Sequence, residues 1–80
     1  MNAHTEAQFA AIHAAESQCN TTLAALRERT ADAGEDDYDA AREAERVGAA
    51  EAFARRDAVI AANGGPIDPI AYLLAIGRDL

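Results

Sequence analysis

TEAQFAAIHAAESQCNTTLAALRERTADA, residues 5–33, is the stretch that decides the fold, because it predicts one long helix. Thr5 and Gln8 have the spacing of a capping box, in which each side chain accepts a hydrogen bond from the other residue's backbone N–H. Beyond them, residues recur at alternating spacings of three and four, which draws one stripe along a helix, as in a coiled-coil seam. The stripe consists of Phe9, Ile12, Glu16, Cys19, Leu23, Leu26 and Thr30. We expect the helix to pack through this stripe, with Gly34 closing it in the left-handed conformation.

A second helix is predicted over about residues 37–62. Carboxylates at Asp36 and Asp37 suit a helix start, both as caps and against the helix dipole. The run Asn63-Gly64-Gly65-Pro66 is a strong stop signal. At 100° per residue one face carries the small residues Ala40, Ala44, Val47, Ala54, Ala58 and Ala61, and the adjacent flank carries Ala49, Phe53 and Ile60. This apolar arc is wider than one neighbouring helix covers.

Two further features complete the predicted fold. Glu51 and Arg55 have the spacing of an ion pair on the outer side of the second helix. A short third helix is expected over residues 68–77, with Asp68 as its cap, Pro69 at its first position and an inward face of Ile70, Leu73, Leu74 and Gly77. The fold class is therefore all-α: one domain over residues 1–80, an antiparallel hairpin of two long helices closed by a short C-terminal third helix.

Charge and composition exclude several classes of protein. The chain has 14 Asp and Glu against 7 Arg and no Lys, for a net charge of −7. That balance disfavours direct binding to nucleic acid or to an anionic membrane and favours a protein partner with a basic surface. One cysteine excludes an intramolecular disulfide. No apolar stretch approaches the ~20 residues of a membrane span, so we expect a soluble, cytoplasmic protein.

No pattern in the sequence indicates catalysis. His13 and Glu16 have a spacing that suits two ligands on one metal, but a site needs three or four, so we expect no metal. Cys19 occupies a position in the stripe where a small apolar residue belongs, and no neighbour in the sequence activates its thiol. Gly64-Gly65-Pro66 lacks the Lys and the further glycines of a phosphate loop. We therefore expect neither an enzyme nor a bound cofactor.

One cluster carries more carboxylates than a solvated loop requires. We call it the acidic tip, and it consists of Asp32, Glu35, Asp36, Asp37, Tyr38 and Asp39. Preference for acids at a helix start accounts for two or three of its five carboxylates. The others suggest a mimic of phosphate groups that binds an Arg- and Lys-rich surface, with Tyr38 adding contact area. A second set of contact residues on the second helix is Val47, Phe53 and Ile60.

Two functions remain open from the sequence. The first is a small acidic inhibitor that occupies a nucleic-acid-binding or assembly surface of a partner protein. Size, charge and helical build are those of phage-encoded inhibitors such as anti-CRISPR proteins, an analogy of class only, since no motif identifies a family. The alternative is a self-associating structural protein, in which the alanine-rich face pairs two hairpins into a dimeric four-helix bundle.

Overall fold

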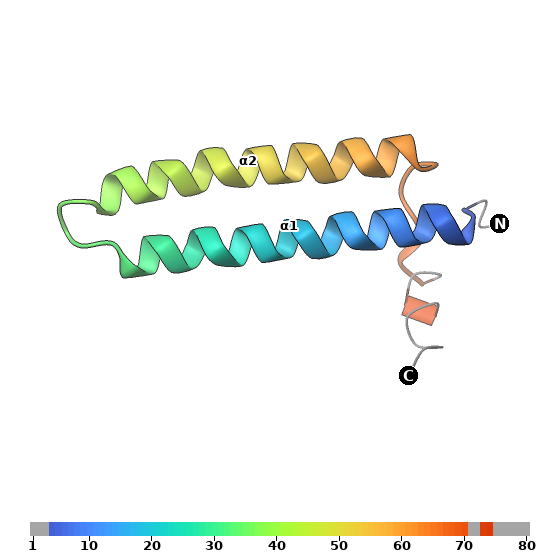
Figure 1. The fold of residues 1–80 in the computed structure, drawn as a ribbon, viewed down its shortest axis with the longest axis horizontal. Coiled ribbons are helices and arrows are strands. Elements are labelled where there is room, and N and C mark those ends of the chain that lie inside the picture. The colour runs from blue at the N-terminus through green and yellow to red at the C-terminus, as the bar shows by residue number, and fades with distance from the viewer. Residues whose placement is uncertain (1–3, 71–72, 75–80) are drawn as a thin grey trace.

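The computed structural model describes residues 4–70 and 73–74 of the 80-residue chain. These residues form two long helices and no strand, which confirms the all-helical hairpin (Figure 1). Helix α1 spans Glu6–Asp32 and α2 spans Tyr38–Ala62. The helices run antiparallel, side by side along their whole lengths, with residues 33–37 as the connection at one end.

The N-terminus of α1 carries the predicted capping box. The backbone N–H of Gln8 donates to Thr5 Oγ1 at 3.1 Å, and the N–H of Thr5 donates to Gln8 Oε1 at 3.0 Å. The other end of α1 differs from the prediction, because Gly34 is not in the left-handed region. Instead Ala33 turns to an extended conformation, with φ −67° and ψ 137°, and its N–H donates to Thr30 O.

Replacing Thr5 with Ala is expected to lower the free energy of unfolding by about 0.5–2 kcal/mol, because the backbone N–H of Gln8 loses its acceptor, Thr5 Oγ1. Urea unfolding followed by circular dichroism measures this loss. The matched control is Thr21→Ala, since the Thr21 hydroxyl only donates to Ser17 O within the helix. That control should be neutral or slightly stabilising, and equal losses in both variants would contradict the role of the cap.

The packed side of α1 is the predicted stripe. Ile12 is 1 % exposed and Cys19 4 % exposed, and the remaining members of the stripe are half-buried. The stripe packs against a line on α2 consisting of Ala41, Glu45, Gly48, Ala52, Arg56 and Val59. The two helices approach closely at Gly48, where an added Cβ would stand 2.8 Å from Leu26 Cδ1. The core of the hairpin is therefore one seam between two helices.

The small-residue face that the sequence predicts on α2 is exposed. Each of its residues is open to solvent in the hairpin: Ala40, Ala44, Val47, Ala54, Ala58 and Ala61. The expected ion pair of Glu51 with Arg55 is also absent, since neither side chain pairs with any described residue. The orientation of α2 about its axis accounts for the first difference, because it places Ala52 and Gly48 in the seam and the larger alanine face outside.

Two glycines close the open end of the hairpin. Gly64 has φ +98° and Gly65 φ +85°, and the N–H of Gly65 reaches back to Ile60 O at 2.9 Å. This six-residue closure is the hydrogen-bond pattern of a Schellman motif, which favours glycine at the left-handed position. His4 Nε2 lies 2.7 Å from Gly65 O and so links the start of the chain to the end of α2.

The predicted third helix lies only in part within the described residues, since 71–72 and 75–77 fall outside them. Asp68 Oδ1 accepts a hydrogen bond from the N–H of Ile70 at 3.0 Å, as a cap at this position should. The side chains expected to face the core do not do so. Ile70, Leu73 and Leu74 are 68 %, 68 % and 61 % exposed.

Candidate functional site

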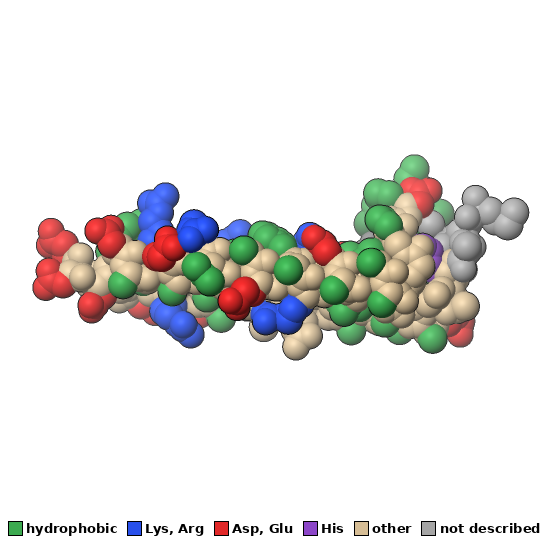
Figure 2. All heavy atoms as spheres, turned by 90° about the horizontal axis from the view of Figure 1, so that it is seen from above, with side chains coloured by type: hydrophobic (Ala, Val, Ile, Leu, Met, Phe, Trp, Pro, Cys, Tyr) green, Lys and Arg blue, Asp and Glu red, His purple; other side chains and the backbone are tan. Residues whose placement is uncertain are grey.

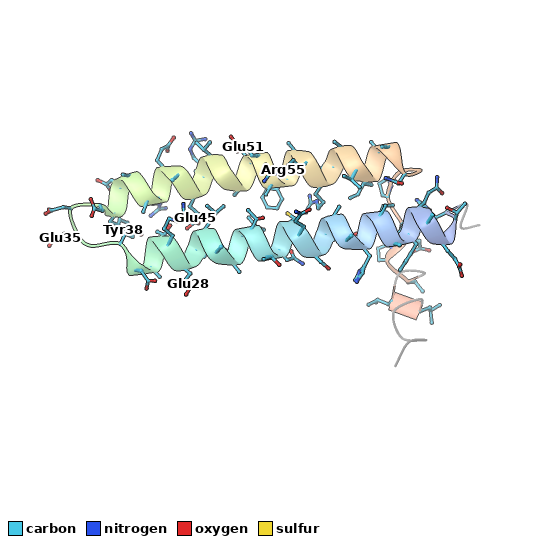
Figure 3. The ribbon with its side chains drawn as sticks, viewed as in Figure 1. Glu28, Glu35, Tyr38, Glu45, Glu51 and Arg55 are labelled. Carbon is cyan, nitrogen blue, oxygen red and sulfur yellow. The ribbon has the colours of Figure 1, made fainter. Side chains whose placement is uncertain are left out.

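The acidic tip occupies the connection between the helices and the two helix ends beside it. Asp32 is the last residue of α1, Asp37 is the N-cap of α2, and Asp39 lies in the first turn of α2. All six residues of the tip are exposed. Figure 2 shows acidic side chains gathered at this end of the molecule, and Figure 3 shows Glu35 projecting away from both helices.

The backbone explains why the tip stays compact. The N–H of Asp37 donates to Gly34 O at 3.0 Å and closes a turn, and the N–H of Ala41 donates to Asp37 O as the first bond of α2. The Asp37 side chain makes no cap hydrogen bond, which corrects the expectation that its carboxylate caps the helix. The carboxylates of the tip are thus displayed and are not used to fix the helix start.

Helix dipoles account for only part of the cluster. Asp37 and Asp39 lie at the positive, N-terminal end of α2, where negative charge is favourable. Asp32 lies at the C-terminal end of α1, where the dipole is negative and the same charge is unfavourable. No described side chain forms an ion pair with any carboxylate of the tip. The tip therefore concentrates negative charge that the fold does not compensate.

Two acidic residues outside the tip, Glu43 and Asp57, are paired. Arg46 donates hydrogen bonds to both carboxylate oxygens of Glu43. These bonds, and then the charge of the guanidinium, lower the pKa of Glu43 below its ordinary value. Arg56 donates from two nitrogens to Asp57 Oδ1. The charges of Glu43 and Asp57 are therefore compensated within the fold, whereas the five carboxylates of the tip lie close together in the chain without such a partner.

The second predicted set of contact residues is divided by the structure. Val47 is 41 % exposed and Phe53 39 % exposed, but six residues of helix place them about 120° apart around α2. Phe53 lies on the same side as the half-buried Ile60, and the Arg56 guanidinium lies 4.9 Å above its ring. Val47 belongs to a different surface, so these three residues do not form one patch.

A groove that was not predicted from the sequence runs along the seam on one side of the hairpin. Its volume is about 340 Å³, and it is lined by Ala15, Gln18, Cys19, Thr22, Ala52, Arg55, Arg56, Ala58 and Val59. Small residues flanking the seam on both helices produce it, and Ala15 and Ala58 were the signal available in the sequence. The groove also brings Arg55 and Arg56 beside Cys19, a proximity that spacing along the chain did not indicate.

Two further properties of the described residues concern metal binding and membrane insertion. They contain no group of three His, Cys, Asp or Glu side chains placed to hold a metal ion. Neither of the two helices is both long and apolar enough to cross a membrane. Comparison of the chain with protein-family models, curated proteins and solved structures found no match.

Proposed function

We propose that this chain is a non-catalytic, cytoplasmic protein-binding module that inhibits a partner by covering a basic surface with its acidic tip. The observation that supports the proposal is the set of five exposed carboxylates in eight residues, none of them in an ion pair with a described side chain. The surface it covers would be one that binds nucleic acid or supports assembly. In kind, the module would be a small phage-type inhibitor, as anti-CRISPR proteins are.

The mechanism follows from the chemistry of carboxylates and guanidinium groups. Arg pairs with carboxylates through two parallel hydrogen bonds, and these are stronger than bonds between neutral groups. A tip of high negative charge also accelerates encounter with a basic partner and disfavours acidic ones. Tyr38, 42 % exposed at the start of α2, adds an aromatic contact of the type that is enriched where binding energy concentrates.

The test is the triple substitution of Asp36, Asp37 and Asp39 with Asn. We expect partner affinity to fall by about tenfold or more, because each lost carboxylate leaves a partner charge unmatched. Lost dipole stabilisation should cost at most about 0.3–1 kcal/mol per residue. The partner is captured from host lysate on the tagged parent protein, and its affinity for parent and variant is then measured by titration.

The matched control neutralises three exposed carboxylates elsewhere, through Glu6→Gln, Glu28→Gln and Glu43→Gln. It removes the same net charge, so a selective loss in the tip variant isolates the tip from general electrostatic attraction. Parent affinity should also fall as salt rises, and nucleic acid should compete for the same partner surface. Binding that is insensitive to salt and equal in both triple variants would refute the proposal.

A further inference from the structure

The hairpin is a single layer of helices and leaves more surface open than a compact protein does. The chain extends over 52 × 27 × 17 Å, and its radius of gyration is 15.9 Å where a compact chain of 80 residues has roughly 12 Å. The accessible surface of 5973 Å² exceeds by roughly 1,400 Å² the value for a compact protein of 8.4 kDa. The seam covers one side of each helix, so both broad sides of the layer stay open.

One of these broad sides is rich in alanine. We call it the open face, the side of the hairpin that carries the groove. On α2 the residues within about 40° of Ala58 around the helix axis are Ala40, Ala44, Val47, Glu51, Ala54 and Ala62. On α1 the residues within about 40° of Gln18 are mostly alanine as well: Ala7, Ala11, Ala14 and Ala25, with Thr22, Arg29 and Asp32.

Charge separates the open face from the rest of the surface. The ionised side chains in these two sets are Arg29, Asp32 and Glu51, and Arg55 and Arg56 line the groove beside them, so this face has no excess of negative charge although the whole chain has a net charge of −7. Two copies brought together through this face would therefore not press net negative charges against each other. The opposite broad side differs, since there Phe53 is already covered by Arg56 and the ring of Phe9 stacks with that of His13.

We infer that the open face is the interface of a homodimer, in which a second copy of the chain packs its own open face against it. A stable interface of ordinary size takes roughly 800 Å² from each partner, and the excess surface of the hairpin is larger than that. Two layers of two helices then enclose a second core of alanines and Val47. Apart from Asp32 at its margin, the open face is distinct from the acidic tip, so this inference does not depend on the proposed function.

The charged pair beside the groove sets the arrangement of the two copies. Glu51 and Arg55 lie one turn apart on α2 (Figure 3), and neither forms an ion pair within the described chain. In a two-fold dimer a contact between one residue and its partner occurs twice. An axis passing between these positions sets Glu51 of each copy against Arg55 of the other, giving two ion pairs beside the groove, within the contact between the copies.

The experiment measures mass in solution by sedimentation equilibrium over a range of protein concentrations. The parent should approach twice the 8.4 kDa of one chain. Ala58→Glu, which places a charge in the groove, should raise the dimer dissociation constant by about tenfold or more. The matched control is Ala24→Glu, an exposed alanine half a turn around α1 from Ala15, and it should leave the dimer unchanged.

Charge reversal tests the two-fold arrangement. Glu51→Arg and Arg55→Glu should each weaken self-association, because each sets like charges together twice. An equimolar mixture of these two variants should regain the dimer, since one chain then presents two positive charges and the other presents two negative charges at the paired positions. Circular dichroism confirms that every variant remains helical. A parent that stays monomeric, or a dimer that Ala58→Glu and both reversals leave intact, would overturn the assignment.

Discussion

Replacing Ile12 with Ala should lower the free energy of unfolding by about 2–5 kcal/mol. Ile12 is 1 % exposed and is the largest fully buried side chain of the described residues. The only other buried apolar residues there are Cys19 and Ala52, both small. The loss of stability has two parts. The removed atoms no longer gain free energy by leaving water, and they leave a cavity that two rigid helices cannot close. A small domain has about 5–15 kcal/mol to lose in all, so this single change is severe.

Urea unfolding followed by far-UV circular dichroism measures the loss, at one fixed protein concentration because association would add to apparent stability. The control with the same chemistry is Ile70→Ala, whose side chain is 68 % exposed. That control should change the unfolding free energy by no more than about 0.5 kcal/mol. Comparable losses at Ile12 and Ile70 would show that the seam is not the core of the protein.

Helix α1 was predictable from the sequence because its large side chains stand out against alanine. Ile12, Leu23 and Leu26 are separated by small or polar residues, so only one stripe could bury area. The capping box at Thr5 fixed its start by local hydrogen bonding alone. Where local chemistry and hydrophobic spacing agree, a prediction needs no knowledge of the partner helix.

The orientation of α2 was not predictable in the same way. Alanine occurs on every side of this helix, so apolar spacing does not distinguish one face from another. The seam also includes Glu45 and Arg56, which sequence reasoning assigns to solvent. The long aliphatic stem of Arg56 suits a half-buried position, and its guanidinium lies over the ring of Phe53 and donates to Asp57. The packed face was therefore set by the close approach at Gly48, a tertiary contact invisible in the spacing.

The candidate sites also differ in whether neighbouring residues or tertiary contacts determine them. The acidic tip is a local feature of consecutive residues, and the structure displays all six of its members together. Val47 and Phe53 were grouped because both are large and apolar, but six residues of helix place them about 120° apart, so they lie on different surfaces. The groove depends on Ala15 of one helix and Ala58 of the other. A site built from both helices required the register of the hairpin, which the sequence of either helix does not contain.

Gly48→Val tests that register directly and should lower the free energy of unfolding by about 1–3 kcal/mol. Even a Cβ at this position would stand 2.8 Å and 3.1 Å from the two terminal carbons of Leu26. Valine adds two further methyl groups on a side chain that is stiff in helices, so it cannot turn away from the contact. The control is Ala50→Val, an exposed alanine two residues along, where only the lower helix propensity of valine is felt, about 0.5 kcal/mol.

A double-mutant cycle identifies Leu26 as the cause. Leu26→Ala removes the atoms that valine would strike, so the double variant should be more stable than the sum of the two single losses predicts, by about 0.5–3 kcal/mol. The same cycle with Ala50→Val should be additive, because Ala50 is exposed to solvent. Additivity in the Gly48 cycle would place the close approach of the helices elsewhere. The rotation of α2 that exposes the alanine face would then have to be abandoned, and with it the homodimer interface.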